Sequence, residues 1–143
     1  MSEQQGQGPA GQQEPIEQGV LDLAVRVFGL ARAGEAEELA AYVDAGVPAD
    51  LTNEKGDTLL ILAAYHGHAG TVTALLERGA DHGRYNDRGQ TPLAAAVFKQ
   101  SADSVRALLA AGADPDAGQP SARATAAFFD LPVMTALLEG HPA

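Results

Sequence analysis

Apolar positions recur along most of this chain in short runs with helical spacing. In residues 105–109 the apolar side chains stand at i, i+3 and i+4, which places them on one face of an α-helix. A shorter run of the same kind begins at Leu93, directly after Thr91 and Pro92, a pair that favours a helix N-cap and a first helical turn. Gly112 follows the later run and favours its termination. The pattern predicts a short helix, a tight turn and a second short helix.

The same arrangement repeats along the chain with a period of 33 residues. Glycines show the period most simply, since Gly46, Gly79 and Gly112 stand 33 positions apart in succession. The apolar runs of the predicted second helices keep the same step, at residues 39–43, 72–76 and 105–109. A fixed period of this size predicts stacked units, each made of two helices and an extended turn.

These units resemble ankyrin repeats. The resemblance rests on GDTLLILAAYHGH at residues 56–68, LLERGAD at 75–81, GQTPLAAA at 89–96 and LLAAGADPDA at 108–117. It implies an all-α fold, an ankyrin-type solenoid of about four stacked helix-turn-helix repeats with projecting hairpin-like turns. The short, alanine-rich and cysteine-free chain also suggests a bacterial source.

The composition divides the chain into a tail and a repeat domain. Residues 1–14 are rich in Gln, Gly, Glu and Pro, and this composition predicts a disordered tail. Order is expected from Pro15, which suits a first helical turn, so residues 15–143 form the predicted ankyrin repeat domain. Its repeats are expected at residues 20–52, 53–85, 86–118 and 119–143, the last of them truncated.

The chain departs from the family pattern at several positions. Ile61 and Ala94 replace a histidine that usually ties neighbouring turns together, so those hydrogen bonds are not expected and packing has to join the turns. Gln100 stands where Gly67 stands one repeat earlier, which predicts either a positive φ at a non-glycine residue or a rearranged turn. Ser101 is expected to cap the second helix of its repeat.

Charge and composition narrow the classes of function. The formal charge of −10, with nine Lys and Arg residues, disfavours binding to nucleic acid or to an anionic membrane. The sequence has no cysteine, no leader peptide and no apolar run of the roughly 18 residues that a membrane span needs, so we expect a cytoplasmic protein. Phosphate-binding glycine loops and nucleophile motifs are also missing, so we expect neither an enzyme nor a cofactor.

Two groups of side chains raise the question of a metal site. His66 and His68 have no third ligand in sequence, and His68 is expected instead to act as a local cap at the start of a second helix. Asp114 and Asp116 lack the spacing of a calcium loop and are interpreted as solvated turn residues. We therefore expect no metal.

The resemblance also implies where a partner binds, because partners of ankyrin-like stacks usually contact the turn tips and the exposed ends of the first helices. The implied partner-binding residues are Arg32, Glu54, Lys55, Asp57, Tyr65, His66, Asp87, Arg88, Gln90, Phe98, Lys99 and Phe129. Arg32, Tyr65, Phe98 and Phe129 occupy one equivalent place on successive repeats. The aromatic members predict a binding stripe, and packing of Phe98 and Phe129 between the repeats is the alternative.

The sequence thus predicts a non-catalytic protein–protein interaction module, an adaptor or regulator that binds a protein partner on the concave face. The alternative is a self-associating protein, or an enzyme-accessory or small-molecule-binding protein that uses the same groove. A monomer is expected, with a homodimer as the alternative. Nothing in the sequence identifies the partner.

Overall fold

The computed structural model of the chain describes the backbone of residues 3–140 and the side chains of residues 18–140. Within that range the chain forms eight helices and no β-strand. The helices are α1 (Glu3–Ala33), α2 (Ala36–Asp44), α3 (Leu59–Tyr65), α4 (Ala69–Glu77), α5 (Pro92–Lys99), α6 (Ala102–Ala110), α7 (Ala122–Phe128) and α8 (Pro132–Leu138).

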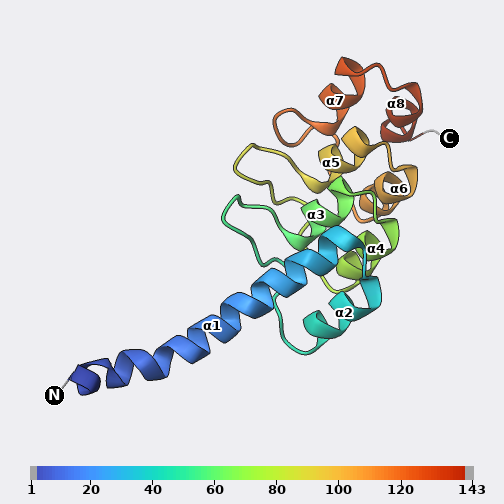
Figure 1. Cartoon of the computed structure of the whole chain (residues 1–143). Helices are drawn as coiled ribbons and strands as arrows, with labels where there is room; N and C mark the ends of the chain where they lie inside the picture. Colours follow the sequence, from blue (N-terminus) through green and yellow to red (C-terminus); the bar gives the residue numbers. More distant parts are fainter. Residues whose placement is uncertain (1–2, 141–143) are drawn as a thin grey trace.

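The helices stack in two layers (Figure 1). Helices α1, α3, α5 and α7 pack in succession in one layer, and α2, α4, α6 and α8 pack in succession in the other. Each helix of the first layer also packs against the next helix along the chain, so the repeating unit is a helix pair. The extended turns between the pairs project to one side of the stack (Figure 1). This all-α solenoid is the fold class that the sequence predicts.

The first helices of three units begin at the same kind of cap. The side-chain oxygens of Thr58, Thr91 and Ser121 each accept a hydrogen bond from the backbone N–H three residues further on, at 3.0, 3.1 and 3.0 Å. Each of these bonds satisfies a donor that would otherwise be unpaired at the start of a helix. Pro92 follows Thr91 as the first residue of α5, which confirms the start predicted for that helix.

The core lies between the two layers and continues from one unit to the next. Residues 59–64 of α3 and 92–97 of α5 are buried without interruption. The second helices contribute only one stripe, in which Val105 and Leu108 are fully buried. Since a helix pair this short has little core of its own, contact with the neighbouring unit is what removes its apolar surface from water.

Asn86 ties two neighbouring turns together. Its side chain is buried, and its Oδ1 accepts hydrogen bonds from the backbone N–H groups of Arg88 and Gln90, both at 3.0 Å. Its Nδ2 donates to Oδ1 of Asp57 in the preceding turn at 2.8 Å. One amide side chain therefore shapes its own turn and fixes the position of that turn on the one before.

The expectation that packing alone joins the turns is wrong. Ile61 and Ala94, which replace the usual histidine, are indeed buried apolar side chains. The turns are nevertheless joined by polar contacts, because the backbone N–H of Asp87 also donates to the carbonyl oxygen of Lys55 at 3.0 Å. This bond and the Asn86 side chain thus join two neighbouring turns without a histidine.

His68 links the first two helix pairs. Its Nε2–H donates to the carbonyl oxygen of Arg32 at 2.7 Å, whereas its side chain makes no hydrogen bond at the start of α4. Gly34, with φ +79°, passes so close to the imidazole that an added Cβ would stand 2.5 Å from Nδ1. The predicted local cap is therefore wrong, since the His68 ring is used between units instead.

The turn between α5 and α6 has the predicted strained residue. Gln100 has φ +62°, in the left-handed region that Gly67 occupies one unit earlier at φ +76°. Asp130 has φ +55° at the corresponding turn between α7 and α8. Ser101 stands at the N-cap of α6, but its hydroxyl donates to Ser104 Oγ at 2.9 Å and caps no backbone N–H, so its predicted role is wrong.

Helix α1 begins at Glu3, so the structure gives a helical backbone to part of the segment for which composition predicts a disordered tail. Gln and Glu favour a helix and the Gly and Pro residues of this segment disfavour one, so propensity alone does not account for the helical backbone. The domain boundary at Pro15 stays a prediction, and residues 1–2 lie outside the described range. No helix between residues 3 and 140 combines the length and the apolar character needed to cross a bilayer.

The positive φ of Gln100 generates a test of stability. We expect Gln100→Gly to raise the free energy of unfolding by about 0.5–1 kcal/mol, because glycine adopts this conformation without steric strain. Ala111 ends α6 with a negative φ of −81°, so Ala111→Gly relieves no strain. It should lower the free energy of unfolding by a similar amount. Urea denaturation of both variants measures the effect, and a loss of stability in Gln100→Gly would contradict the strain.

The contribution of the Asn86 hydrogen bonds to stability can be tested by substitution. We expect Asn86→Ala to lower the free energy of unfolding by about 1–3 kcal/mol, since buried groups of two turns lose their partner. Asn53→Ala is the control, because the Asn53 side chain accepts from Lys55 N–H and Asp57 N–H within its own turn alone. Urea denaturation measures the free energy of unfolding of both variants. An equal loss in the two would show that the hydrogen bond between the turns adds nothing to stability.

Candidate functional site

A groove of about 240 Å³ opens where the turn tips meet the first helices. Its walls come from the end of α1, from two successive turn tips and from α3. The lining residues are Arg32, Asn53, Glu54, Lys55, Asp57, Ile61, Leu62, Tyr65, His66, Arg88 and Gln90. Eight of these belong to the twelve partner-binding residues predicted from the sequence. Residues of separate repeats thus meet in one groove, and sequence reasoning missed Asn53, Ile61 and Leu62.

Three aromatic rings continue from the groove along the stack. Tyr65 stacks on Phe98 with ring centroids 5.9 Å apart and an interplanar angle of 4°. Phe98 meets Phe129 edge to face, with centroids 5.6 Å apart and an angle of 69°. Tyr65 and Phe98 lie at the ends of α3 and α5, and Phe129 directly follows α7, so three of the four first-layer helices contribute one ring each. We call Tyr65, Phe98 and Phe129 the aromatic row.

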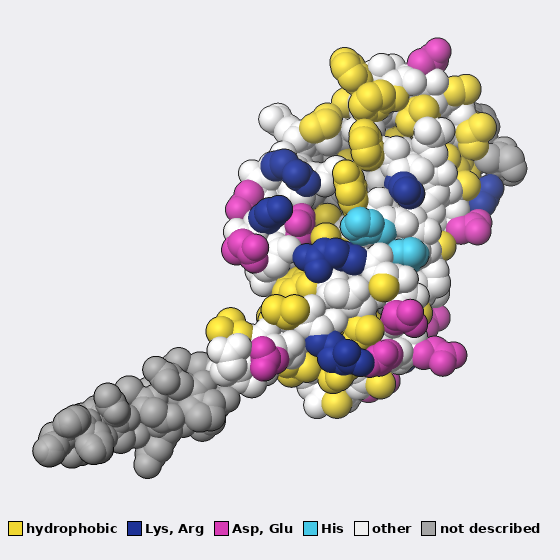
Figure 2. Space-filling view, viewed as in Figure 1, with side chains coloured by type: hydrophobic (Ala, Val, Ile, Leu, Met, Phe, Trp, Pro, Cys, Tyr) yellow, Lys and Arg dark blue, Asp and Glu magenta, His cyan; other side chains and the backbone are white. Residues whose placement is uncertain are grey.

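The aromatic row is a surface feature. Tyr65, Phe98 and Phe129 expose 38%, 45% and 49% of their surface, so Phe98 and Phe129 are not core side chains between the repeats. Figure 2 shows hydrophobic side chains in a column on this face, with His side chains at one end of it and Lys and Arg side chains beside it. The rings contact one another and leave part of their apolar surface in water.

Phe128 extends the aromatic row and was missed by sequence reasoning. Its ring lies 4.9 Å from that of Phe129, at 88°, and 81% of its surface is exposed. The signal that could have found it was the Phe-Phe pair at the end of the last first-layer helix, in a chain with few aromatic residues. Both rings of this pair are exposed in the structure.

The acidic and amide members of the predicted set divide into two groups. Glu54 and Asp87 are exposed at the turn tips, as the resemblance implies. Gln90 is half-buried, and its Oε1 accepts from the Asn86 amide at 3.3 Å. Asp57 also lines the groove, but it is buried and its carboxylate accepts from the same amide, so that carboxylate is used within the fold and its contact with a partner stays a prediction.

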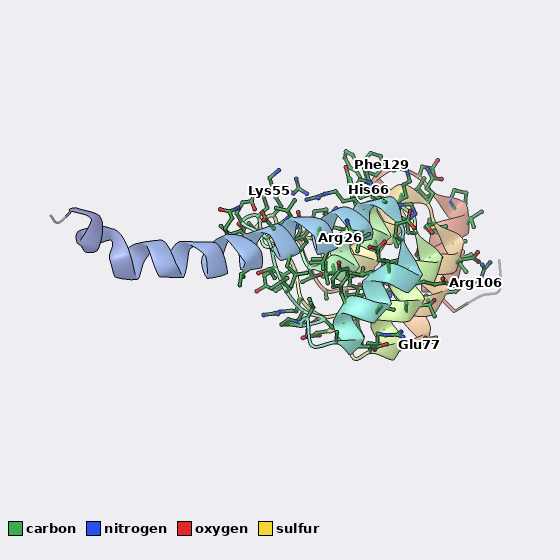
Figure 3. The ribbon with its side chains drawn as sticks, turned by 60° about the horizontal axis from the view of Figure 1, so that its bottom comes forward. Arg26, Lys55, His66, Glu77, Arg106 and Phe129 are labelled. Atoms are coloured by element: carbon green, nitrogen blue, oxygen red, sulfur yellow. The ribbon has the colours of Figure 1, made fainter. Side chains whose placement is uncertain are left out.

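The basic members are exposed and free of ion pairs. Among the described side chains, no carboxylate lies within 4.0 Å of a charged group of Arg32, Lys55, Arg88 or Lys99. The arginines that do form salt bridges are Arg26, Arg78, Arg106 and Arg123. Figure 3 shows Lys55, His66 and Phe129 along one edge of the molecule, with Arg106 and Glu77 away from it.

His66 lies in a positive environment. Burial lowers its pKa below the usual value, and the positive charges of His68, Arg32 and Lys99 lower it further. The His66 and His68 rings are nearly parallel, at 16°, with centroids 6.4 Å apart. The described residues contain no group of three His, Cys, Asp or Glu side chains that could hold a metal ion. The lowered pKa favours the neutral form of the His66 ring, and its protonation responds to the nearby positive charges.

This environment generates a test. We expect Arg32→Ala to raise the pKa of His66, because the variant removes a positive charge that opposes protonation of the ring. NMR titration of the histidine ring signals measures the change. Arg106→Ala is the control, since Arg106 lies away from His66 (Figure 3) and should leave its pKa unchanged. An unaltered or lowered pKa in Arg32→Ala would contradict the positive environment.

Comparisons with known proteins agree with the repeat fold of this chain. Residues 28–119 match ankyrin repeats, in three copies. A Pseudomonas aeruginosa protein, described by its name as an ankyrin repeat protein, is 51% identical over 47 residues, which are 33% of this chain and 28% of that protein. The aligned part thus spans less than a third of the relative. Ankyrin repeats generally mediate protein–protein interactions, and the family is generally non-catalytic. The chain belongs to the ankyrin repeat family.

Proposed function

We propose that this protein is a non-catalytic adaptor or regulator that binds a protein partner on its concave face. The binding surface comprises the aromatic row, the groove beside it and the exposed turn tips, which are Glu54, Lys55, Asp87 and Arg88. A cytoplasmic location is part of the proposal and is supported by the absence of cysteine. The Pseudomonas aeruginosa relative supports a bacterial source.

The observation that carries the proposal is the partial exposure of three touching aromatic rings from three successive repeats. Apolar side chains that expose a continuous surface are a frequent mark of an interaction site. Aromatic residues also dominate the binding energy of many interfaces, because they remove a large area from water and lose little side-chain entropy. The row lies beside exposed charged groups, so an apolar strip is bordered by polar side chains, as in many protein interfaces.

A protein partner fits the site better than a small molecule does. The groove of about 240 Å³ is smaller than the roughly 300–1,000 Å³ of most small-molecule pockets. Its walls carry both acidic and basic side chains. They therefore do not direct several groups of one charge at a single polar group of a small ligand. The aromatic row runs out of the groove over two further repeats, and only an extended partner contacts both features at once.

Photo-crosslinking tests the proposal. A photoreactive phenylalanine analogue at Phe98 should form adducts with a protein partner in the source cell. The same analogue at Tyr85 is the control, because Tyr85 is 66% exposed but lines a separate depression beside Gly89 and Gly118. Mass spectrometry then identifies the crosslinked protein. Equal adducts from both positions, or none at Phe98, would contradict the proposal, and an adduct of two copies of this chain would indicate self-association.

The captured partner allows a measurement of affinity. We expect Tyr65→Ala/Phe98→Ala to weaken binding by about tenfold to a hundredfold, since central aromatic contacts each contribute about 1–2 kcal/mol or more. Tyr85→Ala should bind like the wild type. Circular dichroism has to show an intact fold in both variants, which is expected because all three rings are exposed. Unchanged affinity of a folded double variant would place the binding surface elsewhere.

A further inference from the structure

We infer that the partner segment is acidic and carries aromatic or branched aliphatic side chains. Its carboxylates face the four basic residues of the concave face, and its apolar side chains pack on the aromatic row. This inference rests on the proposed function and specifies the chemistry of the partner. It follows from the distribution of charge on the surface and from the position of the rings beside that charge.

The concave face has the opposite charge balance to the rest of the chain. The twelve residues of the predicted binding set include four basic and three acidic side chains, which leaves a net charge of +1 with histidine neutral. The whole chain carries −10. One of the three acidic side chains, Asp57, is buried and hydrogen-bonded to Asn86, so only Glu54 and Asp87 are exposed there. A positive surface on an acidic protein attracts an acidic segment and steers its approach.

The basic side chains are available to a partner. Arg32, Lys55, Arg88 and Lys99 make no salt bridge with a described residue, whereas four arginines elsewhere do. A partner carboxylate therefore gains a new ion pair on this face without breaking an existing one. The arginine guanidinium groups can also bind a carboxylate through two parallel hydrogen bonds, which adds direction to the attraction.

Positive charge and exposed apolar surface meet at one place. Arg32, Lys55 and Arg88 line the same groove as Tyr65, the first ring of the aromatic row. Lys99 directly follows Phe98, and its side chain crosses Gly67, where an added Cβ would stand 3.2 Å from Lys99 Cγ. The basic groups therefore accompany the row, so one extended segment with both kinds of side chain can contact both.

The environment of His66 supports a positive potential in the groove. Burial is the main cause of its lowered pKa, but the charges of His68, Arg32 and Lys99 act in the same direction. These positive charges oppose protonation of the ring, and the same charges would attract a partner carboxylate placed beside it.

An acidic peptide fits this surface better than a nucleic acid, although both are anionic and both can pack on aromatic rings. Nucleic acids carry a charge at every nucleotide, and their affinity depends on many phosphate contacts. The exposed carboxylates of Glu54 and Asp87 each directly precede one of the four cations in sequence, Lys55 and Arg88, and the chain as a whole is strongly acidic. A peptide can place its few carboxylates at the cations and neutral residues opposite the acids.

Selection from a random peptide display library tests the inference, because the library samples acidic, neutral and basic segments alike. The immobilised protein should enrich peptides that contain Asp or Glu together with Phe, Tyr, Leu or Ile. Fluorescence polarisation of an enriched peptide then gives its affinity. Raising the salt from about 0.1 M to about 1 M, which shortens the Debye length from about 10 Å to about 3 Å, should weaken binding.

Charge-reversed variants provide the sharpest comparison. We expect Lys55→Glu/Arg88→Glu to reduce the affinity for an enriched peptide by about tenfold or more, since two attractive contacts become repulsive. The control is Arg84→Glu/Arg106→Glu, which changes the net charge equally at exposed residues outside the groove and the aromatic row. The control should bind within about twofold of the wild type, because the peptide is proposed to contact neither Arg84 nor Arg106.

The outcomes separate this inference from the proposed function. Enriched peptides that are neutral or basic, and that lose affinity in Tyr65→Ala/Phe98→Ala but not in Lys55→Glu/Arg88→Glu, overturn the acidic partner and leave concave-face binding intact. Enriched peptides that bind the aromatic variant as well as the wild type contradict both, and so does the absence of enrichment. Tighter binding of a single-stranded oligonucleotide, or a dimer in sedimentation that charge reversal dissociates, would replace the acidic peptide with another occupant.

Discussion

The structure depends on one constraint, which is that no helix pair of this chain can bury its apolar surface alone. Its helices are seven to nine residues long beyond α1, so each pair has to pack against the next. Stacking places equivalent residues of successive repeats side by side. The hydrogen bond from His68 to Arg32 then joins the first unit to the second, and the bond from Asn86 to Asp57 joins the second to the third.

The aromatic row is a direct consequence of the way in which stacking aligns equivalent residues of successive repeats. Tyr65, Phe98 and Phe129 are far apart in sequence, and they touch only because their helices end at the same level of the stack. A one-turn shift of α5 would separate its ring from both neighbours. The same alignment brings Arg32 and the turn tips to one groove. The elements that hold the stack together thus also assemble the surface on which we propose that a partner binds.

Periodicity made the fold and much of the candidate site predictable. A residue that recurs at one place in each repeat has to line one surface, so Tyr65 and Phe98 could be grouped from sequence alone. The hydrogen-bond partners of individual side chains were harder to predict from the sequence. His68 was expected to cap its own helix and instead bonds Arg32, while Asp57 was expected at the surface and is buried against Asn86. These contacts depend on the orientation of side chains between units, which spacing does not specify.

The central claim is that one surface, built by stacking, binds the partner through its rings. NMR of the protein with isotopically labelled Phe and Tyr tests it most directly, because each ring can be followed while the crosslinked partner or an enriched peptide is added. Binding at the proposed surface predicts that the ring signals of Tyr65, Phe98 and Phe129 shift together in one titration, and that the exposed ring of Tyr85 stays unchanged. Saturable binding that shifts Tyr85 and leaves the three rings of the row unaltered would contradict it.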